Sequence, residues 1–184
     1  MDKPTLIIMC GLARSGKSTW IRENRPDVVA ISPDKVRSEI FGHQFFANAE
    51  DFIWAMTKGM AKLILEQGKS VLIDATHTTW GSRTAWIRIA KQYNAEVEIV
   101  WIKTSLDECL ERNEKSEDGQ KLPEDVIERM ATNFVDPWHD FDTDGIPIKL
   151  IQVPYSDKII KGMDAEFSNY YLKEIVDYYI NKEI

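Results

Sequence analysis

Short apolar runs alternate with amphipathic stretches along the whole chain. Near-continuous apolar runs of this length, bounded by polar residues, are typical of parallel strands that are buried on both faces. The runs that predict strands are residues 6–10, 28–31, 70–74, 96–102 and 148–153. Their even distribution predicts five strands separated by other elements.

The stretches between these runs carry apolar residues at the three- and four-residue spacing of helices. Ser32 and Pro33 form a helix start signal, and Gly68 a helix stop. Helices are expected at residues 18–23, 34–40, 52–68, 80–93 and 106–112, from Pro123 onward, and at 165–180. Strands alternating with helices predict an α/β protein, with a five-stranded parallel sheet and helices on both faces.

Length and composition fit this class. With 184 residues, 43% hydrophobic and 29% charged, the chain is expected to form one domain over residues 1–184. No run approaches the roughly 18 apolar residues of a membrane helix, and no basic leader precedes the first run. A cytoplasmic protein without a membrane partner is therefore expected. Cys10 and Cys109 lack metal-ligand spacing, which predicts two core thiols.

The chain is acidic, with a formal net charge of −7 and a sequence pI near 5.1. A broad nucleic-acid-binding face needs many Lys and Arg side chains to displace counterions, so it is not expected here. A small basic pocket around one phosphate group remains compatible with this charge, because electrostatic attraction is strongest within about 8–10 Å.

The clearest chemical signal follows the first apolar run. Gly11, Gly16, Lys17 and Ser18 have the spacing G-x-x-x-x-G-K-[ST]. The glycines allow backbone N–H groups to face phosphate oxygens, Lys17 supplies charge to the β- and γ-phosphates, and Ser18 ligates Mg²⁺. A strand before the loop and a helix after it complete the context of a P-loop. ATP and Mg²⁺ are the expected cofactors, and the predicted nucleotide-binding residues are Gly11, Leu12, Ala13, Arg14, Ser15, Gly16, Lys17, Ser18 and Thr19.

Ligands of such sheets bind beyond the carboxyl ends of the strands. After the second strand, Asp34 and Arg37 lie at i and i+3 and are expected on one face of a helix. The carboxylate can accept the proton of an acceptor alcohol, and the guanidinium can bind a neighbouring phosphate or carboxylate. The alternative for Asp34 is a plain helix N-cap.

The third strand ends in Asp74, followed by Thr76 and His77. Asp74 follows apolar residues as a Walker-B carboxylate does, which predicts a role in binding Mg²⁺ or its water shell. A hydrogen bond from the P-loop is the alternative. Thr76 and His77 are candidates for binding the acceptor, although His77 could equally cap the following loop.

The order and spacing of these segments resemble the 5′-kinase domain of phage polynucleotide kinase and related P-loop kinases, over roughly residues 5–135. The segments that carry the resemblance are the P-loop, Asp34-x-x-Arg37, Asp74 with Thr76, Arg83 to Trp86, and Arg112-Asn113. The resemblance implies that Asp34 is the general base that activates a 5′-hydroxyl and that Arg37 contacts the adjacent phosphate. It also implies that Lys17 binds the ATP phosphates.

The same resemblance implies a short mobile lid at about residues 113–122, with Arg112 as a catalytic cation. Two features differ from the family pattern. Ala13-Arg14 stands where many relatives have Pro-Gly, which adds a cation to the loop. The second basic lid residue of the family falls near Ser116, so Lys115 or Lys121 is the candidate replacement.

The sequence therefore predicts an ATP-dependent kinase, with the 5′-hydroxyl end of a nucleic acid, held locally, as the first candidate for its acceptor. One alternative is a kinase of the same fold that acts on a nucleoside, sugar or antibiotic hydroxyl. A second alternative is a switch protein that hydrolyses a nucleoside triphosphate. No Asn-Lys-x-Asp segment is present to select guanine, and a switch would leave Asp34 and Arg37 without a function. Neither the oligomeric state nor a preference for DNA over RNA follows from the sequence.

Overall fold

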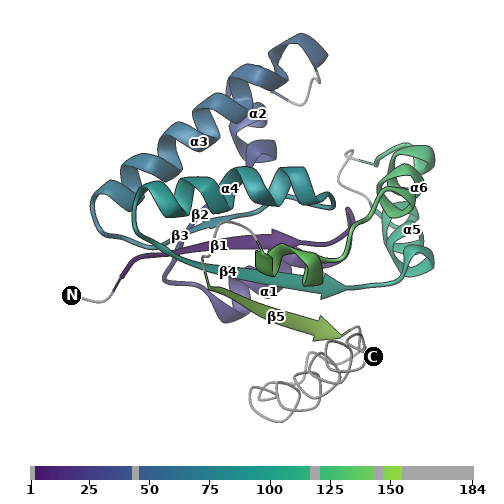
Figure 1. The fold of residues 1–184 in the computed structure, drawn as a ribbon. Coiled ribbons are helices and arrows are strands. Elements are labelled where there is room, and N and C mark those ends of the chain that lie inside the picture. Colours follow the sequence, from purple (N-terminus) through teal and green to yellow (C-terminus); the bar gives the residue numbers. More distant parts are fainter. Residues whose placement is uncertain (1–2, 43–45, 117–120, 143–146, 155–184) are drawn as a thin grey trace, which may run out of the picture.

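The structure, a computed structural model, describes residues 3–42, 46–116, 121–142 and 147–154. Within these residues, five parallel strands form one sheet in the order β2-β3-β1-β4-β5 (Figure 1). The strands are β1 (Thr5–Cys10), β2 (Val29–Ile31), β3 (Val71–Ile73), β4 (Glu96–Lys103) and β5 (Ile148–Pro154). The five-stranded parallel α/β fold predicted from the sequence is confirmed.

Helices cover the two faces of the sheet and its carboxyl edge. Figure 1 shows α3 and α4 on one face, α1 on the other, and α5 and α6 beyond the ends of the strand arrows. The helices are α1 (Lys17–Asn24), α2 (Pro33–Phe41), α3 (Glu50–Glu66), α4 (Trp80–Gln92), α5 (Leu106–Glu114) and α6 (Glu124–Thr132), with short 3₁₀ helices η1 (Ala47–Ala49) and η2 (Pro137–Asp142). None of the helices in the described part of the chain has the length and apolar character needed to cross a bilayer.

Several element bounds differ from the sequence prediction by one or two residues, and the end of α5 is one of them. The polar loop was expected to begin at Asn113, but α5 continues to Glu114. The last residues of this helix are polar, so the apolar spacing in the sequence does not reveal where it ends. Its last turn is closed by a hydrogen bond from the Lys115 N–H to the Glu111 carbonyl. The residues of the expected lid between 117 and 120, and the helix expected at 165–180, lie outside the described residues.

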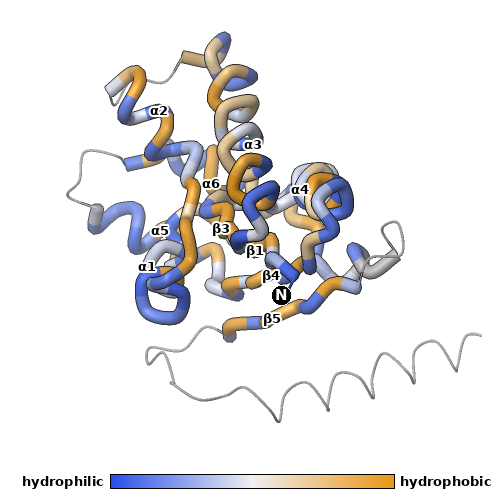
Figure 2. The backbone as a smooth tube through the Cα atoms, turned by 90° about the vertical axis from the view of Figure 1, so that its left-hand side faces the viewer, coloured by the Kyte–Doolittle hydropathy of each residue, from blue (hydrophilic) through white to orange (hydrophobic). Residues whose placement is uncertain are grey.

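The core has two layers because alternate residues of a strand face opposite sides of the sheet. Leu6, Ile8 and Cys10 of β1 pack with residues of α3 and α4. Ile7 and Met9 pack on the other face, with Trp20 and Ile21 of α1 among their neighbours. In Figure 2 the central strands are largely hydrophobic, whereas α1 is largely hydrophilic.

Both cysteines are free and buried, as the sequence predicted. Burial raises the pKa of Cys10 to about 12 and that of Cys109 to about 11. Both side chains are therefore protonated thiols near neutral pH, which is consistent with a packing role.

Candidate active site

The P-loop begins where the central strand β1 ends. Gly11 has φ +148°, and a Cβ atom there would lie 2.8 Å from the Ile102 carbonyl oxygen and 2.9 Å from Ser15 Oγ. Its N–H donates a 2.9 Å hydrogen bond to the carbonyl of Thr76. Only glycine fits this position, and the bond fixes the loop against the segment that follows β3.

The loop is also supported from its other side. Leu12 and Ala13 pack with Cys109 of α5 and Ile127 of α6. These contacts place both helices directly against the phosphate-binding loop.

The Lys17 side chain folds over the loop that contains it. Its Nζ donates to the carbonyls of Gly11 (3.2 Å) and Leu12 (2.6 Å) and lies 3.4 Å from Ser15 Oγ. Burial lowers the pKa of Lys17, and the charge of Asp74 opposes that shift. An ammonium group that is sheltered from water interacts more strongly with phosphate than an exposed one.

Ser18 and Asp74 bring together two oxygen groups from different elements. Ser18 Oγ donates to Asp74 Oδ2 at 2.9 Å, so the hydrogen bond to the P-loop considered for Asp74 is present. Hydroxyl and carboxylate oxygens are also ligands that suit Mg²⁺. Among the described residues, no group of three or more His, Cys, Asp and Glu side chains could hold a metal ion. Mg²⁺ that is bound to phosphates usually keeps several waters and takes only one or two protein ligands, and the oxygens of Ser18 and Asp74 suit such a site.

Asp34 lies in the first turn of α2, whose N-cap residue is Ser32. The Asp34 side chain is 85% exposed, and its Oδ1 accepts a 2.5 Å hydrogen bond from Arg37 Nη1. The plain N-cap considered for Asp34 is therefore not observed. Its charge is the smallest of those that raise the pKa of Lys17, so the carboxylate lies close enough to the P-loop to act on the lysine electrostatically.

Arg37 has a second carboxylate partner that the sequence did not reveal. Its Nε and Nη2 donate to Glu50 Oε1 and Oε2 at 2.8 and 2.9 Å. These bonds raise the pKa of Arg37 above its ordinary value. Glu50 begins α3, and in the sequence it looks like an ordinary acidic residue in a first helical turn.

His77 was expected at the acceptor cleft, and that prediction is wrong. The side chain is 3% exposed, and its ring lies between Trp54 and Trp86 at centroid distances of 6.3 and 6.2 Å. Its Nδ1 is 2.8 Å from the carbonyl oxygen of Met9. Packing between two tryptophans holds the ring in the core, away from any acceptor. Thr76 contributes its carbonyl to the Gly11 bond described above.

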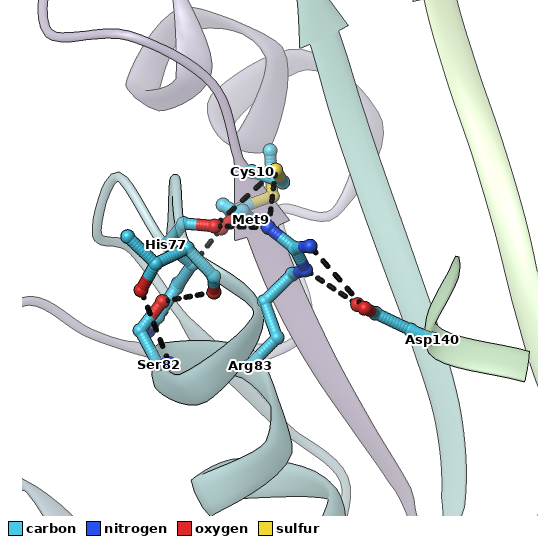
Figure 3. Close-up of polar contacts among 7 residues, drawn as sticks. Met9, Cys10, His77, Ser82, Arg83 and Asp140 are labelled. Carbon is cyan, nitrogen blue, oxygen red and sulfur yellow. Dashed lines mark hydrogen bonds and ion pairs between the residues drawn. The ribbon is translucent and has the colours of Figure 1, made fainter. Parts of the chain in front are cut away.

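A buried ion pair supports the segment after β3 (Figure 3). Arg83 of α4 is fully buried and donates from Nη1 to the His77 carbonyl at 2.8 Å. Its Nε and Nη2 bind the Asp140 carboxylate, which is also fully buried. The sequence marked Arg83 only through the family resemblance, and nothing in the sequence identified Asp140 as its partner.

Arg112 lies against the P-loop. Its Nη1 donates to the Arg14 carbonyl at 3.3 Å and would lie 3.4 Å from a Cβ atom at Gly16. Its Nε donates to Glu108 Oε1 at 2.8 Å within α5. Arg14 itself has a positive φ of 64°. Arg112 therefore lies beside the backbone of the P-loop.

The other lid cations face α5. Lys115 pairs with Glu111, and Lys121 pairs with Glu114. Neither of these ion pairs includes a residue of the P-loop.

Asn113, unlike these cations, closes the base of the loop. Its side chain is buried, donates to the Leu122 carbonyl at 2.8 Å and accepts from the Leu122 N–H at 3.0 Å. The two ends of the segment expected to form the lid are thus joined by one amide group.

The site combines a phosphate-binding loop, a buried lysine and a carboxylate whose charge acts on that lysine. These features, at the carboxyl edge of a parallel sheet, define a P-loop domain. The sequence matches the AAA domain family AAA_33 over residues 6–137, and the chain belongs to that family.

A curated protein is similar to the chain in sequence over most of the chain's length. L-seryl-tRNA(Sec) kinase from Methanococcus maripaludis is 30% identical over 139 residues, which make up 72% of this chain and 53% of that protein. The chain thus spans about half the length of this curated relative.

Solved structures share the fold at lower identity. A chain of the Pnkp1/Rnl/Hen1 RNA repair complex is 23% identical, with a TM-score of 0.69 over 91% of this chain and 54% of that chain. A gluconokinase from Sinorhizobium meliloti is 15% identical, with a TM-score of 0.56 over 86% of this chain and 87% of that one.

Proposed function

We propose that this kinase transfers the γ-phosphoryl group of ATP to a hydroxyl of a nucleic acid, with the 5′-hydroxyl of a polynucleotide as the first candidate. The observation that carries the proposal is the pair formed by Asp34 and Arg37. An exposed carboxylate stands one helical turn from a guanidinium, and its charge acts on Lys17 of the P-loop. This arrangement suits an acceptor with a hydroxyl next to an anionic group.

In this proposal, the acceptor oxygen forms a bond to the γ-phosphorus while the bond to the β,γ-bridging oxygen breaks. The acceptor proton passes to Asp34, and ADP is the leaving group. Lys17 and Arg112 stabilise the negative charge of the transferring phosphoryl group. Bound Mg²⁺, held through Ser18 and Asp74, would supply further charge neutralisation at the phosphates.

Two observations support a nucleic acid as the acceptor. The relative with 30% identity is by name a kinase of a seryl-tRNA, and one structural neighbour belongs to an RNA repair complex. The net charge of −7 favours local binding at a chain end over binding along a strand. The identity to the tRNA kinase favours the hydroxyl of a seryl group carried by tRNA as the second candidate.

The test is transfer of labelled γ-phosphate from ATP to a panel of acceptors. The panel holds RNA and DNA oligonucleotides with 5′-hydroxyl ends, tRNA charged with serine, nucleosides and gluconate. Transfer to the oligonucleotides is expected, and Asp34→Asn run in parallel should remove it. Transfer confined to seryl-tRNA would select the second candidate, whereas transfer to nucleosides or gluconate alone would contradict a nucleic acid acceptor. ATP hydrolysis that no acceptor stimulates would indicate a nucleotide-dependent switch.

A further inference from the structure

Glu50 and Arg37 form a two-point contact between α3 and α2. The carboxylate binds the Nε and Nη2 edge of the guanidinium through two hydrogen bonds of 2.8 and 2.9 Å. A planar guanidinium held by two parallel bonds is fixed in orientation as well as in position. The plane of the Arg37 side chain is therefore set by a residue of another helix.

The two carboxylates that contact Arg37 lie in different environments. The Asp34 side chain is 85% exposed, whereas those of Glu50 and Arg37 are 25% and 18% exposed. Sheltered, charge-assisted bonds hold geometry better than exposed ones, which water and salt weaken. Glu50 thus forms the fixed end of the network, and Asp34 forms the end that faces the cleft.

Removing Glu50 would change the environment of Asp34. Arg37 already donates to Asp34 from Nη1. Without the Glu50 carboxylate, the guanidinium is able to turn and bind Asp34 through two nitrogens. The carboxylate proposed as the base would then be held in an ion pair, away from an incoming hydroxyl.

We propose that Glu50 is a positioning residue that holds Arg37 in the orientation required to contact the acceptor and keeps the Asp34 carboxylate available to it. This inference rests on the proposed function, because it assigns the acceptor to Asp34 and Arg37. The competing explanation is that Glu50 only stabilises the N-terminus of α3 through its charge. Asp51 is the matched control, since it lies in the same first turn and carries the same charge.

The first experiment compares Glu50→Gln with Asp51→Asn, using a 5′-hydroxyl oligonucleotide as acceptor. Glu50→Gln should lower kcat by roughly 10- to 100-fold, because a small displacement of a positioning group has an effect of this size. The KM for ATP should remain unchanged in both variants, and Asp51→Asn should keep wild-type kcat. Equal effects of the two substitutions would mean that Glu50 only stabilises the N-terminus of α3 through its charge, and would overturn the proposal.

A double-mutant cycle tests whether Glu50 acts through Arg37. In an Arg37→Ala background, Glu50→Gln should produce no further loss of kcat/KM, because its target is absent. Independent losses that multiply would show that Glu50 acts elsewhere. Glu50→Asp, which keeps the charge with a shorter side chain, should recover part of the lost activity.

A measurement without any acceptor separates this inference from the proposed function. In ¹⁵N-labelled protein, the Arg37 Nε–H signal should exchange slowly with water in the wild type and in Asp51→Asn. In Glu50→Gln it should exchange rapidly or disappear. A protected signal in folded Glu50→Gln would overturn the positioning role. If protection depends on Glu50 but no oligonucleotide is phosphorylated, the proposed acceptor is wrong, and the kinetic comparison is repeated with the acceptor that the panel identifies.

Discussion

The Ser18 hydroxyl donates a 2.9 Å hydrogen bond to the Asp74 carboxylate and joins the P-loop to the end of β3. The two oxygens come from elements 56 residues apart, so the contact exists only in the folded sheet. Asp74 can act on the phosphate-binding loop in two ways. It orients Ser18, and its charge opposes the effect of burial on the lysine.

Asp74→Asn is expected to raise the Mg²⁺ concentration required for half-maximal activity. The amide retains an oxygen but loses the charge that attracts a cation or its water shell. Loss of a group that orients metal ligands typically weakens metal affinity by roughly 10- to 100-fold. Titration of transfer activity with Mg²⁺ at saturating ATP measures the effect. An unchanged Mg²⁺ requirement would show that Asp74 does not help to bind Mg²⁺ and serves only as the acceptor of the Ser18 hydrogen bond.

Asp34→Asn should lower kcat by roughly 10²- to 10⁴-fold, which is the range for loss of a general base. ATP affinity should change little, because the Asp34 side chain is exposed in the cleft and contacts Arg37 rather than the P-loop. Steady-state transfer assays and equilibrium binding of an ATP analogue measure the two quantities separately. A large loss of ATP affinity would move Asp34 to the nucleotide side of the cleft.

A nucleoside 3′-monophosphate should be a better acceptor than the bare nucleoside. In the proposed function Arg37 binds the first phosphate beyond the accepting hydroxyl, and a charge-assisted contact of about 1.5–3 kcal/mol corresponds to roughly 10- to 150-fold in kcat/KM. Arg37→Ala should remove this preference. Salt dependence should be shallow, since the acidic chain offers few further phosphate contacts. Equal use of both acceptors would contradict a polynucleotide end as substrate.

Asp140→Asn should destabilise the fold by about 3–5 kcal/mol, because it leaves the fully buried Arg83 without its charged partner. The loss should appear in urea unfolding at neutral pH. Replacing the exposed Glu111, which pairs with Lys115, with Gln serves as a control and should have little effect. Since Arg83 also donates to the His77 carbonyl, Asp140→Asn should loosen the segment that carries Asp74 and Thr76.

Local patterns predicted the elements that local physics determines. Runs of apolar residues identified the strands, and the spacing around Gly11 and Lys17 identified the P-loop, because backbone geometry and phosphate binding need those residue types in that order. The pairing of Asp34 with Arg37 was also predictable, since residues at i and i+3 share a helix face.

Contacts between distant segments were not predictable in the same way. Glu50 and Asp140 each bind an arginine on another element, and no periodicity marks such a pair. For His77, the sequence suggested a contact that the structure does not show. Its place after the third strand made it a candidate for binding the acceptor, but the tertiary fold places Trp54 and Trp86 around the ring. Burial of a single polar side chain depends on which helices meet above it, and a single sequence does not record that.

The buried His77 should make stability depend on pH. The Met9 carbonyl only accepts hydrogen bonds, so Nδ1 carries the proton of the neutral ring, and the buried Nε2 has no partner in the described structure. Burial, with smaller effects from Lys17 and Arg83, lowers the pKa of His77 from 6.5 to about 4.

In the unfolded chain the ring takes up a proton near pH 6.5, whereas in the folded protein it stays neutral down to about pH 4. The unfolded state therefore binds more protons between these values. The free energy of unfolding is unaffected by titration of this histidine above about pH 6.5 and decreases as the pH falls from 6.5 toward 4. At pH 5 this loss amounts to roughly 2 kcal/mol relative to pH 7. Urea unfolding of wild type and His77→Asn at both pH values tests the expectation. The variant starts from lower stability because its side chain fills less of the core, but it should lack this part of the pH dependence. Equal changes between pH 7 and pH 5 in the two proteins would show that His77 is not the titrating group.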